Sequence, residues 1–129
     1  MPQSSARGKV FVIDDDHDVR KAFALLISAA GYKVEALADA STYAARDVPR
    51  ATPACIVVDM RMPGMSGLEL MSSVAGTERG LPFVLVSGHG DEDSRAQALA
   101  AGAVDLLFKP VDAATLLRAI ERALAIRHG

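Results

Sequence analysis

Short runs of apolar residues alternate along this chain with longer segments in which apolar residues recur every three or four positions. The first pattern is typical of buried strands and the second of amphipathic helices. Five runs predict strands, over residues 9–13, 32–38, 55–58, 82–86 and 104–108. The run over residues 32–38 alternates apolar and polar side chains more than the others, so we expect it at an edge of the sheet.

The segments between these runs predict helices. In the first, Val19, Phe23 and Leu26 fall on one face of a helix that begins near His17, and Gly31 is a plausible stop. Further helices are expected over residues 41–46, from residue 66 to about 76, over the alanine-rich stretch before residue 102, and after residue 112. The pattern is therefore five strand–helix pairs.

Strict alternation of this kind predicts an α/β fold, a doubly wound five-stranded parallel sheet with five helices. Right-handed crossovers and five strands favour the flavodoxin-like strand order 2-1-3-4-5. In such sheets, ligands bind at the edge formed by the carboxyl ends of the strands. Candidate functional residues are therefore expected at that edge.

Composition narrows the choice of function. A chain of 129 residues, half of them hydrophobic, suits one domain with one sizeable core. The net charge of −2, the low aromatic content and the lack of a basic run disfavour nucleic-acid binding by this segment. There is no signal peptide and no apolar run near ~20 residues, so we expect a cytoplasmic protein with no membrane segment.

Polar side chains stand at the ends of four predicted strands. Asp14 and Asp15 follow the first strand, Asp59 the third, Ser87 the fourth and Lys109 the fifth. In the expected order, the first and third strands are neighbours, so the three carboxylates face one another across the ligand crevice. Three clustered carboxylates need a cation, and hard oxygen ligands with room for water favour Mg²⁺ over Ca²⁺.

The same residues suit phosphoryl transfer. A carboxylate can attack a phosphoryl group, and Asp59 is the best candidate because it stands alone at its strand end. The phosphoryl oxygens then need partners, which Mg²⁺, Lys109 and the Ser87 hydroxyl can supply.

Five motifs in order carry a resemblance to a known family. They are V-I-D-D-D-H-D-V-R, V-V-D-M-R-M-P-G-M-S-G-L-E-L, L-V-S-G-H-G-D, A-G-A-V-D and F-K-P. Over roughly residues 9–124 the chain resembles a response-regulator receiver domain of bacterial two-component signalling, especially the FixJ type. The resemblance implies a CheY-like fold over residues 9–127, preceded by a flexible tail over residues 1–8.

The resemblance also assigns roles at the acidic edge. It implies that Asp59 is the phosphoacceptor and that Asp15, Asp59 and the backbone carbonyl of Arg61 bind Mg²⁺ directly. Asp14 would act on the metal through water. Ser87 and Lys109 would sense the phosphoryl group.

Residues near Lys109 are candidates for transmitting the effect of phosphorylation away from the acceptor site. The resemblance implies a cis bond between Lys109 and Pro110. Three residues before Lys109, the family usually carries the aromatic residue that rotates inward on activation, whereas this chain has Leu106. Phe108 lies on the same strand face and is a second candidate for the switch, and His89 is a candidate for tuning water access to the acceptor.

The function that the resemblance implies is a switch and not an enzyme. A histidine kinase donates the phosphoryl group, and the added charge shifts an inactive–active equilibrium. The output surface would comprise the fourth helix, fifth strand and fifth helix, acting on a downstream protein or a second copy. Arg95, Asp105, Arg118 and Arg122 belong to this surface, where they pair with a partner or are simply solvated.

Three alternatives remain. FixJ-type receivers are often followed by a helix-turn-helix domain, so the chain is either a stand-alone receiver or the N-terminal receiver of a DNA-binding transcription regulator. A haloacid-dehalogenase-like phosphatase needs a second aspartate two residues after the first, where this chain has Arg61. A flavodoxin-like FMN carrier needs a phosphate loop where the acidic Asp14 and Asp15 stand.

Overall fold

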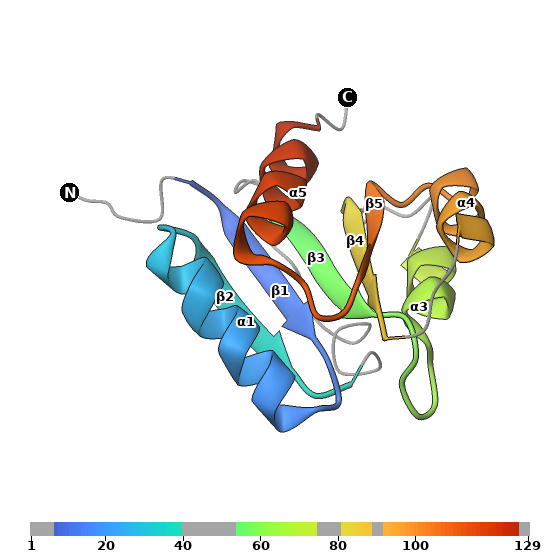
Figure 1. Ribbon diagram of the computed structural model, residues 1–129, viewed down its shortest axis with the longest axis horizontal. Helices are drawn as coiled ribbons and strands as arrows, with labels where there is room; N and C mark the ends of the chain where they lie inside the picture. Colours follow the sequence, from blue (N-terminus) through green and yellow to red (C-terminus); the bar gives the residue numbers. More distant parts are fainter. Residues whose placement is uncertain (1–6, 40–53, 75–80, 89–91, 127–129) are drawn as a thin grey trace.

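The computed structural model of the chain describes residues 7–39, 54–74, 81–88 and 92–126. Strands and helices alternate along these residues, except that the third strand is the next described element after the second, with residues 40–53 between them outside the description (Figure 1). They are β1 (Lys9–Ile13), α1 (His17–Ala29), β2 (Lys33–Leu37), β3 (Ala54–Asp59), α3 (Gly67–Val74), β4 (Phe83–Ser87), α4 (Glu92–Ala100), β5 (Asp105–Phe108) and α5 (Ala113–Ala125). The predicted helix over residues 41–46 lies outside the described residues.

The five strands form one parallel sheet in the order β2-β1-β3-β4-β5. The predicted fold class and strand order are therefore confirmed. The strand β2 lies at an edge and is only half-buried, as its alternating pattern predicted. By contrast, all six residues of β3 are buried at the centre of the sheet. Among the described helices, none combines the length and the apolar composition needed to cross a lipid bilayer.

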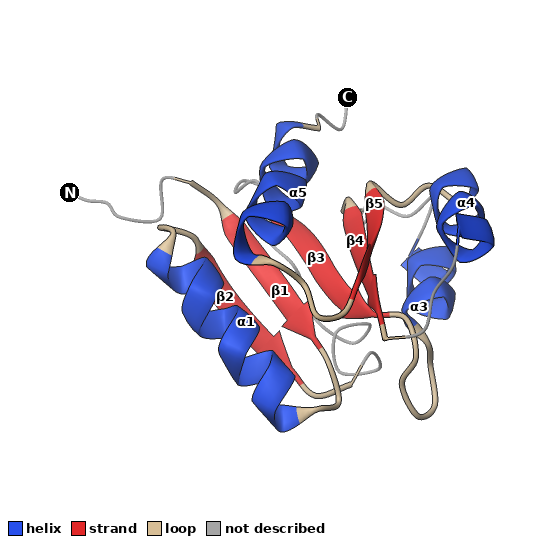
Figure 2. Cartoon of the chain, in the orientation of Figure 1, coloured by secondary structure: helices blue, strands red, loops and turns tan. Residues whose placement is uncertain are grey.

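Helices cover both faces of the sheet (Figure 2). Successive strand side chains point to opposite faces, so each strand contributes to two hydrophobic clusters. One cluster joins the sheet to α3 and α4 and includes Phe11, Ile56 and Leu106. The other joins it to α1 and α5 and includes Val57, Ile120 and Cys55. This three-layer packing explains the continuous apolar runs of the central strands.

Side chains that cap the helices determine where the loops at the sheet edge end. The Asp16 carboxylate accepts the backbone N–H groups of the first turn of α1. Ser66 and Glu69 form the predicted capping box of α3, since each side chain accepts the other's backbone N–H. Asp112 caps α5, also as predicted. At the end of α1, Gly31 has a φ of 99°, which is typical of a glycine that terminates a helix.

Candidate functional site

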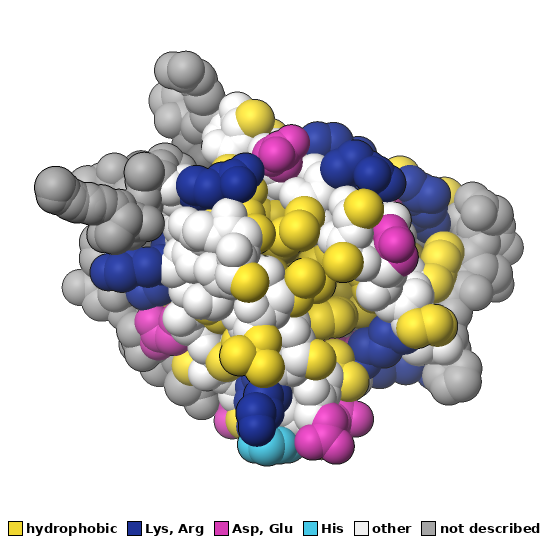
Figure 3. Space-filling model, turned by 60° about the vertical axis from the view of Figure 1, so that its left-hand side comes forward, with side chains coloured by type: hydrophobic (Ala, Val, Ile, Leu, Met, Phe, Trp, Pro, Cys, Tyr) yellow, Lys and Arg dark blue, Asp and Glu magenta, His cyan; other side chains and the backbone are white. Residues whose placement is uncertain are grey.

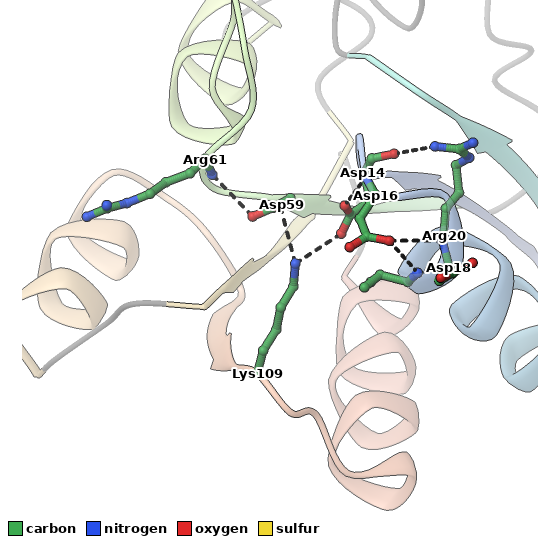
Figure 4. A network of polar contacts seen from close by, with 8 residues as sticks. Asp14, Asp16, Asp18, Arg20, Asp59, Arg61 and Lys109 are labelled. Carbon is green, nitrogen blue, oxygen red and sulfur yellow. Dashed lines mark hydrogen bonds and ion pairs between the residues drawn. The ribbon is translucent and has the colours of Figure 1, made fainter.

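Polar residues at the strand ends meet at one edge of the sheet, where Figure 4 shows Asp14, Asp59 and Lys109 pointing toward one another. Asp14 directly follows β1, Asp59 is the last residue of β3, and Ser87 is the last residue of β4. The side chain of Lys109 enters from the end of β5, and its Nζ lies 3.3 Å from both Asp14 Oδ2 and Asp59 Oδ2. The Lys109 backbone N–H also donates to the Ser87 carbonyl at 2.8 Å. The structure thus brings together the four strand ends that the sequence indicated.

Three carboxylates of this edge form a cluster that could hold a metal ion. One oxygen each of Asp14, Asp15 and Asp59 lies within 4.8 Å of the other two. Asp14 and Asp59 are buried, with 1% and 8% of their surfaces exposed, whereas Asp15 is exposed. A set of carboxylate oxygens open to water on one side suits a hard divalent cation such as Mg²⁺.

Electrostatics at this cluster depend on Lys109. Burial raises the pKa of Asp14 above its ordinary value; the Asp16 amide and the charge of Lys109 oppose the rise, and the nearby charge of Asp59 adds to it. Burial alone would lower the pKa of Lys109, but the charges of Asp14 and Asp59 outweigh it and the pKa is raised. Lys109 therefore remains a cation at neutral pH and partly balances the buried carboxylates.

The loop after β3 presents the Asp59 carboxylate to this edge. Asp59 Oδ1 accepts the backbone N–H of Arg61 at 3.2 Å, while the Arg61 side chain runs away from the carboxylates (Figure 4). Gly67, at the start of α3, packs against the same loop, and a Cβ built on it would lie 2.7 Å from the Asp59 carbonyl oxygen. Only glycine fits there without a backbone shift. The sequence pattern did not indicate this role, although Gly67 belongs to the motif V-V-D-M-R-M-P-G-M-S-G-L-E-L.

The switch candidates occupy different environments. Leu106 is 1% exposed and belongs to the core beneath α3 and α4, where it pairs in register with Leu85. Phe108 is half-buried and pairs in register with Ser87. Phe108 is therefore the aromatic residue of β5 that stands opposite Ser87 in the sheet. His89 lies outside the described residues, and the Lys109–Pro110 bond is cis, as the resemblance implied.

The charged residues of the α4–β5–α5 surface pair within the chain. Asp105 is 5% exposed, and its two carboxylate oxygens contact Arg95 of α4 and Arg122 of α5, each at 2.9 Å. Arg118, by contrast, is exposed. These charges were expected to be solvated or to pair with a partner. In the structure, Asp105 forms ion pairs that link both helices to the edge strand.

An apolar patch covers part of the surface on the side of α1 (Figure 3). Charged side chains surround it, and acidic side chains lie together with a histidine at its lower border. Partly buried apolar residues of α1 and α5, including Phe23, Leu26 and Leu117, pack on this face of the sheet. His17 and Asp18 at the start of α1 are exposed. The packing of α1 and α5 on this face therefore leaves some apolar surface open to solvent.

Comparison with known proteins gives the class to which this fold and site belong. The model of the response regulator receiver domain family matches residues 10–121, so the chain belongs to that family. Receiver domains are phosphorylation-dependent switches of two-component signalling, which confirms the class inferred from the motifs.

Individual relatives agree with this assignment. The response regulator protein TodT of Pseudomonas putida is 37% identical over 117 residues, which cover 91% of this chain and 51% of TodT. The structure of the response regulator StyR is 42% identical with a TM-score of 0.81, covering 90% of this chain and 58% of that one. The FixJ-N crystal structure is 33% identical with a TM-score of 0.83, covering 95% and 97%. The chain thus spans about half the length of TodT.

Proposed function

We propose that Asp59 of this chain accepts a phosphoryl group in a Mg²⁺-dependent reaction, with a histidine kinase as the donor. The observation that carries the proposal is the position of Lys109 Nζ, 3.3 Å from both Asp59 and Asp14, beside a three-carboxylate cluster. One fixed cation and a site for a second one can together neutralise the oxygens of a transferred phosphoryl group.

The donor set fits Mg²⁺. Asp15 and Asp59 would hold the ion with their carboxylates, and Arg61 with its backbone carbonyl. Asp14, whose oxygens accept from the Asp16 amide and from Lys109, would act through water, as the resemblance to receiver domains implies. When bound, Mg²⁺ stabilises the negative charge on the phosphoryl oxygens.

The remaining chemistry belongs to side chains of this domain. An Asp59 carboxylate oxygen attacks the phosphorus, a new O–P bond forms, and the P–N bond to the donor histidine breaks with its electron pair going to the imidazole. Lys109 pairs with one phosphoryl oxygen and the Ser87 hydroxyl donates to another. Because the acceptor is consumed and is restored only by hydrolysis, the domain acts as a switch and not as an enzyme.

The output would pass to the α4–β5–α5 surface. Recruitment of Ser87 and Lys109 to the phosphoryl group would pull on the ends of β4 and β5, where Phe108 pairs in register with Ser87 and directly precedes Lys109. The pairs from Asp105 to Arg95 and Arg122 would carry a shift of β5 to both helices. The partner that binds this surface would be a downstream protein or a second copy of the chain. This segment itself would make no contact with nucleic acid.

A second candidate concerns the whole protein. It is that the chain is the N-terminal receiver of a FixJ-type transcription regulator, a proposal supported by the 51% coverage of TodT. The sequence of the full gene decides between this reading and a stand-alone receiver. A haloacid-dehalogenase-like phosphatase stays disfavoured, because the Arg61 side chain points away from the carboxylates (Figure 4).

The test of the proposed function is incubation with acetyl phosphate followed by intact mass measurement. We expect a phosphoryl adduct with Mg²⁺ present and little adduct when the ion is removed with EDTA. No adduct in Mg²⁺, or an equal adduct in EDTA, would contradict the proposed function.

A further inference from the structure

Arg20 of α1 reaches back to the loop that carries the acidic residues. Its Nη1 donates to the Asp14 carbonyl oxygen at 2.7 Å, and the side chain is partly buried (Figure 4). The backbone N–H of Arg20 meanwhile donates to the Asp16 carbonyl at 3.0 Å in the first helical turn. The residue therefore ties the start of α1 to the last peptide before the helix-capping loop.

The bond to Asp14 acts on a peptide plane that Asp15 shares. The carbonyl of Asp14 and the nitrogen of Asp15 belong to the same planar unit, so fixing the direction of the carbonyl fixes the plane from which Asp15 begins. The other polar groups of Asp14 are also held; for example, its N–H donates to Leu37 and its Oδ2 accepts from Lys109. Arg20 is the group that holds the carbonyl.

Asp15 needs this support more than its neighbours do. Its side chain is exposed, and within the described residues its carboxylate makes no hydrogen bond or ion pair. No polar contact of its own within the described residues holds the carboxylate toward Asp14 and Asp59, so its direction depends on its rotamer and on the backbone from which it starts. A rotation of the Asp14–Asp15 peptide would turn it away from the other two.

We propose that Arg20 is a positioning residue for the metal site, which aims the Asp15 carboxylate by holding the Asp14–Asp15 peptide plane. The inference rests on the proposed Mg²⁺ site. Electrostatics alone predicts the opposite effect on Mg²⁺ affinity, because a guanidinium near the cluster repels a divalent cation and its removal should tighten binding. Loss of the side chain should therefore weaken Mg²⁺ binding only if its positioning effect outweighs its charge.

The experiment measures the Mg²⁺ dissociation constant by isothermal titration calorimetry for the wild type, Arg20→Met and Lys21→Met. Lys21→Met is the matched control, since Lys21 directly follows Arg20, is exposed and carries the same charge. We expect Arg20→Met to bind Mg²⁺ about tenfold more weakly, the lower end of the usual cost of losing a residue that orients a ligand. Lys21→Met should bind Mg²⁺ as well as the wild type or slightly more tightly.

An Arg20→Met variant that binds Mg²⁺ as tightly as the wild type, or more tightly, overturns the inference. Circular dichroism and thermal unfolding show whether each variant is folded. Where Arg20→Met does not fold, Arg20→Lys decides, because it keeps the charge and loses the planar donor group: weaker binding than wild type supports positioning, and equal binding overturns it. A wild type that binds no Mg²⁺ overturns the proposed metal site itself, an outcome distinct from failure of Arg20 alone.

Discussion

Lys109 Nζ and Asp59 Oδ2 lie 3.3 Å apart, although 50 positions separate the two residues in the chain. The same ammonium group contacts the buried Asp14 at an equal distance. A single lysine thus balances two buried carboxylates at the end of a parallel sheet. Under the proposed function, it would hold them in place for a cation and for a phosphoryl group.

Replacing Lys109 by methionine should destabilise the protein most when no metal is present. Asp14 and Asp59 would then lack their cation, which should lower the free energy of unfolding by about 2 kcal/mol, as for loss of hydrogen bonds to charged groups. Mg²⁺ should restore more stability to the variant than it adds to the wild type, since the ion can replace the lost charge. Urea unfolding in EDTA and in Mg²⁺ measures both effects; equal stabilities of variant and wild type in EDTA would refute this account.

The raised pKa of Asp14 predicts how metal-free stability changes with pH. Because the folded state holds this proton more tightly than the unfolded chain, the contribution of Asp14 is largest below its ordinary pKa of 3.8 and is lost as the pH rises through the raised value. We expect the difference in unfolding free energy between wild type and Asp14→Asn to change in that interval. Carbon-detected NMR of the Asp14 carboxyl gives the pKa directly, and a midpoint at or below 3.8 would be inconsistent with the structure.

Gly67→Ala should impair both the fold and phosphoryl uptake. The added methyl group would lie 2.7 Å from the Asp59 carbonyl oxygen, so α3 or the acceptor strand must move. Overpacking of this kind usually costs about 1–3 kcal/mol, and the displaced carboxylate should accept phosphoryl groups more slowly. Thermal unfolding and the rate of adduct formation report the two effects. Gly88→Ala is the stability control, because nothing lies within 4 Å of a Cβ built there; equal losses from both substitutions would rule out the close contact as the cause.

Phe108, and not Leu106, should transmit the response to phosphorylation from the Ser87 hydroxyl to α4 and α5. Phe108→Leu removes the ring beside Ser87 and should leave phosphoryl uptake intact while reducing the change that phosphorylation causes at α4 and α5. Leu106→Met keeps the volume of a core residue and should have little effect. Amide NMR shifts of α4 and α5, compared before and after phosphorylation, measure the response. If Leu106→Met reduced the phosphorylation-induced shift changes more than Phe108→Leu did, position 106 and not 108 would be the switch residue.

Much of this architecture follows from local sequence patterns. Apolar runs predicted the strands within one or two residues at most ends, because a strand buried on both faces requires continuous apolar side chains. The strand order then placed Asp14, Asp59, Ser87 and Lys109 at one edge, since parallel strands end together.

Other features depend on distances that no pattern encodes. The requirement for glycine at position 67 arises from the carbonyl of Asp59, eight residues earlier in the chain. The φ of Gly67 itself does not lie in the left-handed region that favours glycine. The burial of Asp105 was missed because an acid at the start of an edge strand usually meets water. Here Arg95 and Arg122 reach it from two helices and replace that water. Arg20 was likewise overlooked, because its partner is a backbone carbonyl and not a side chain.

The most direct test of the central claim is to identify the residue that carries the phosphoryl group. After reaction with acetyl phosphate and Mg²⁺, borohydride reduces an aspartyl phosphate to homoserine, which peptide mass spectrometry locates. We predict homoserine at position 59 in the wild type and no reduced residue in Asp59→Asn. Homoserine at position 14 or 15, or an unchanged yield of adduct in Asp59→Asn, would contradict the assignment of Asp59 as the phosphoacceptor.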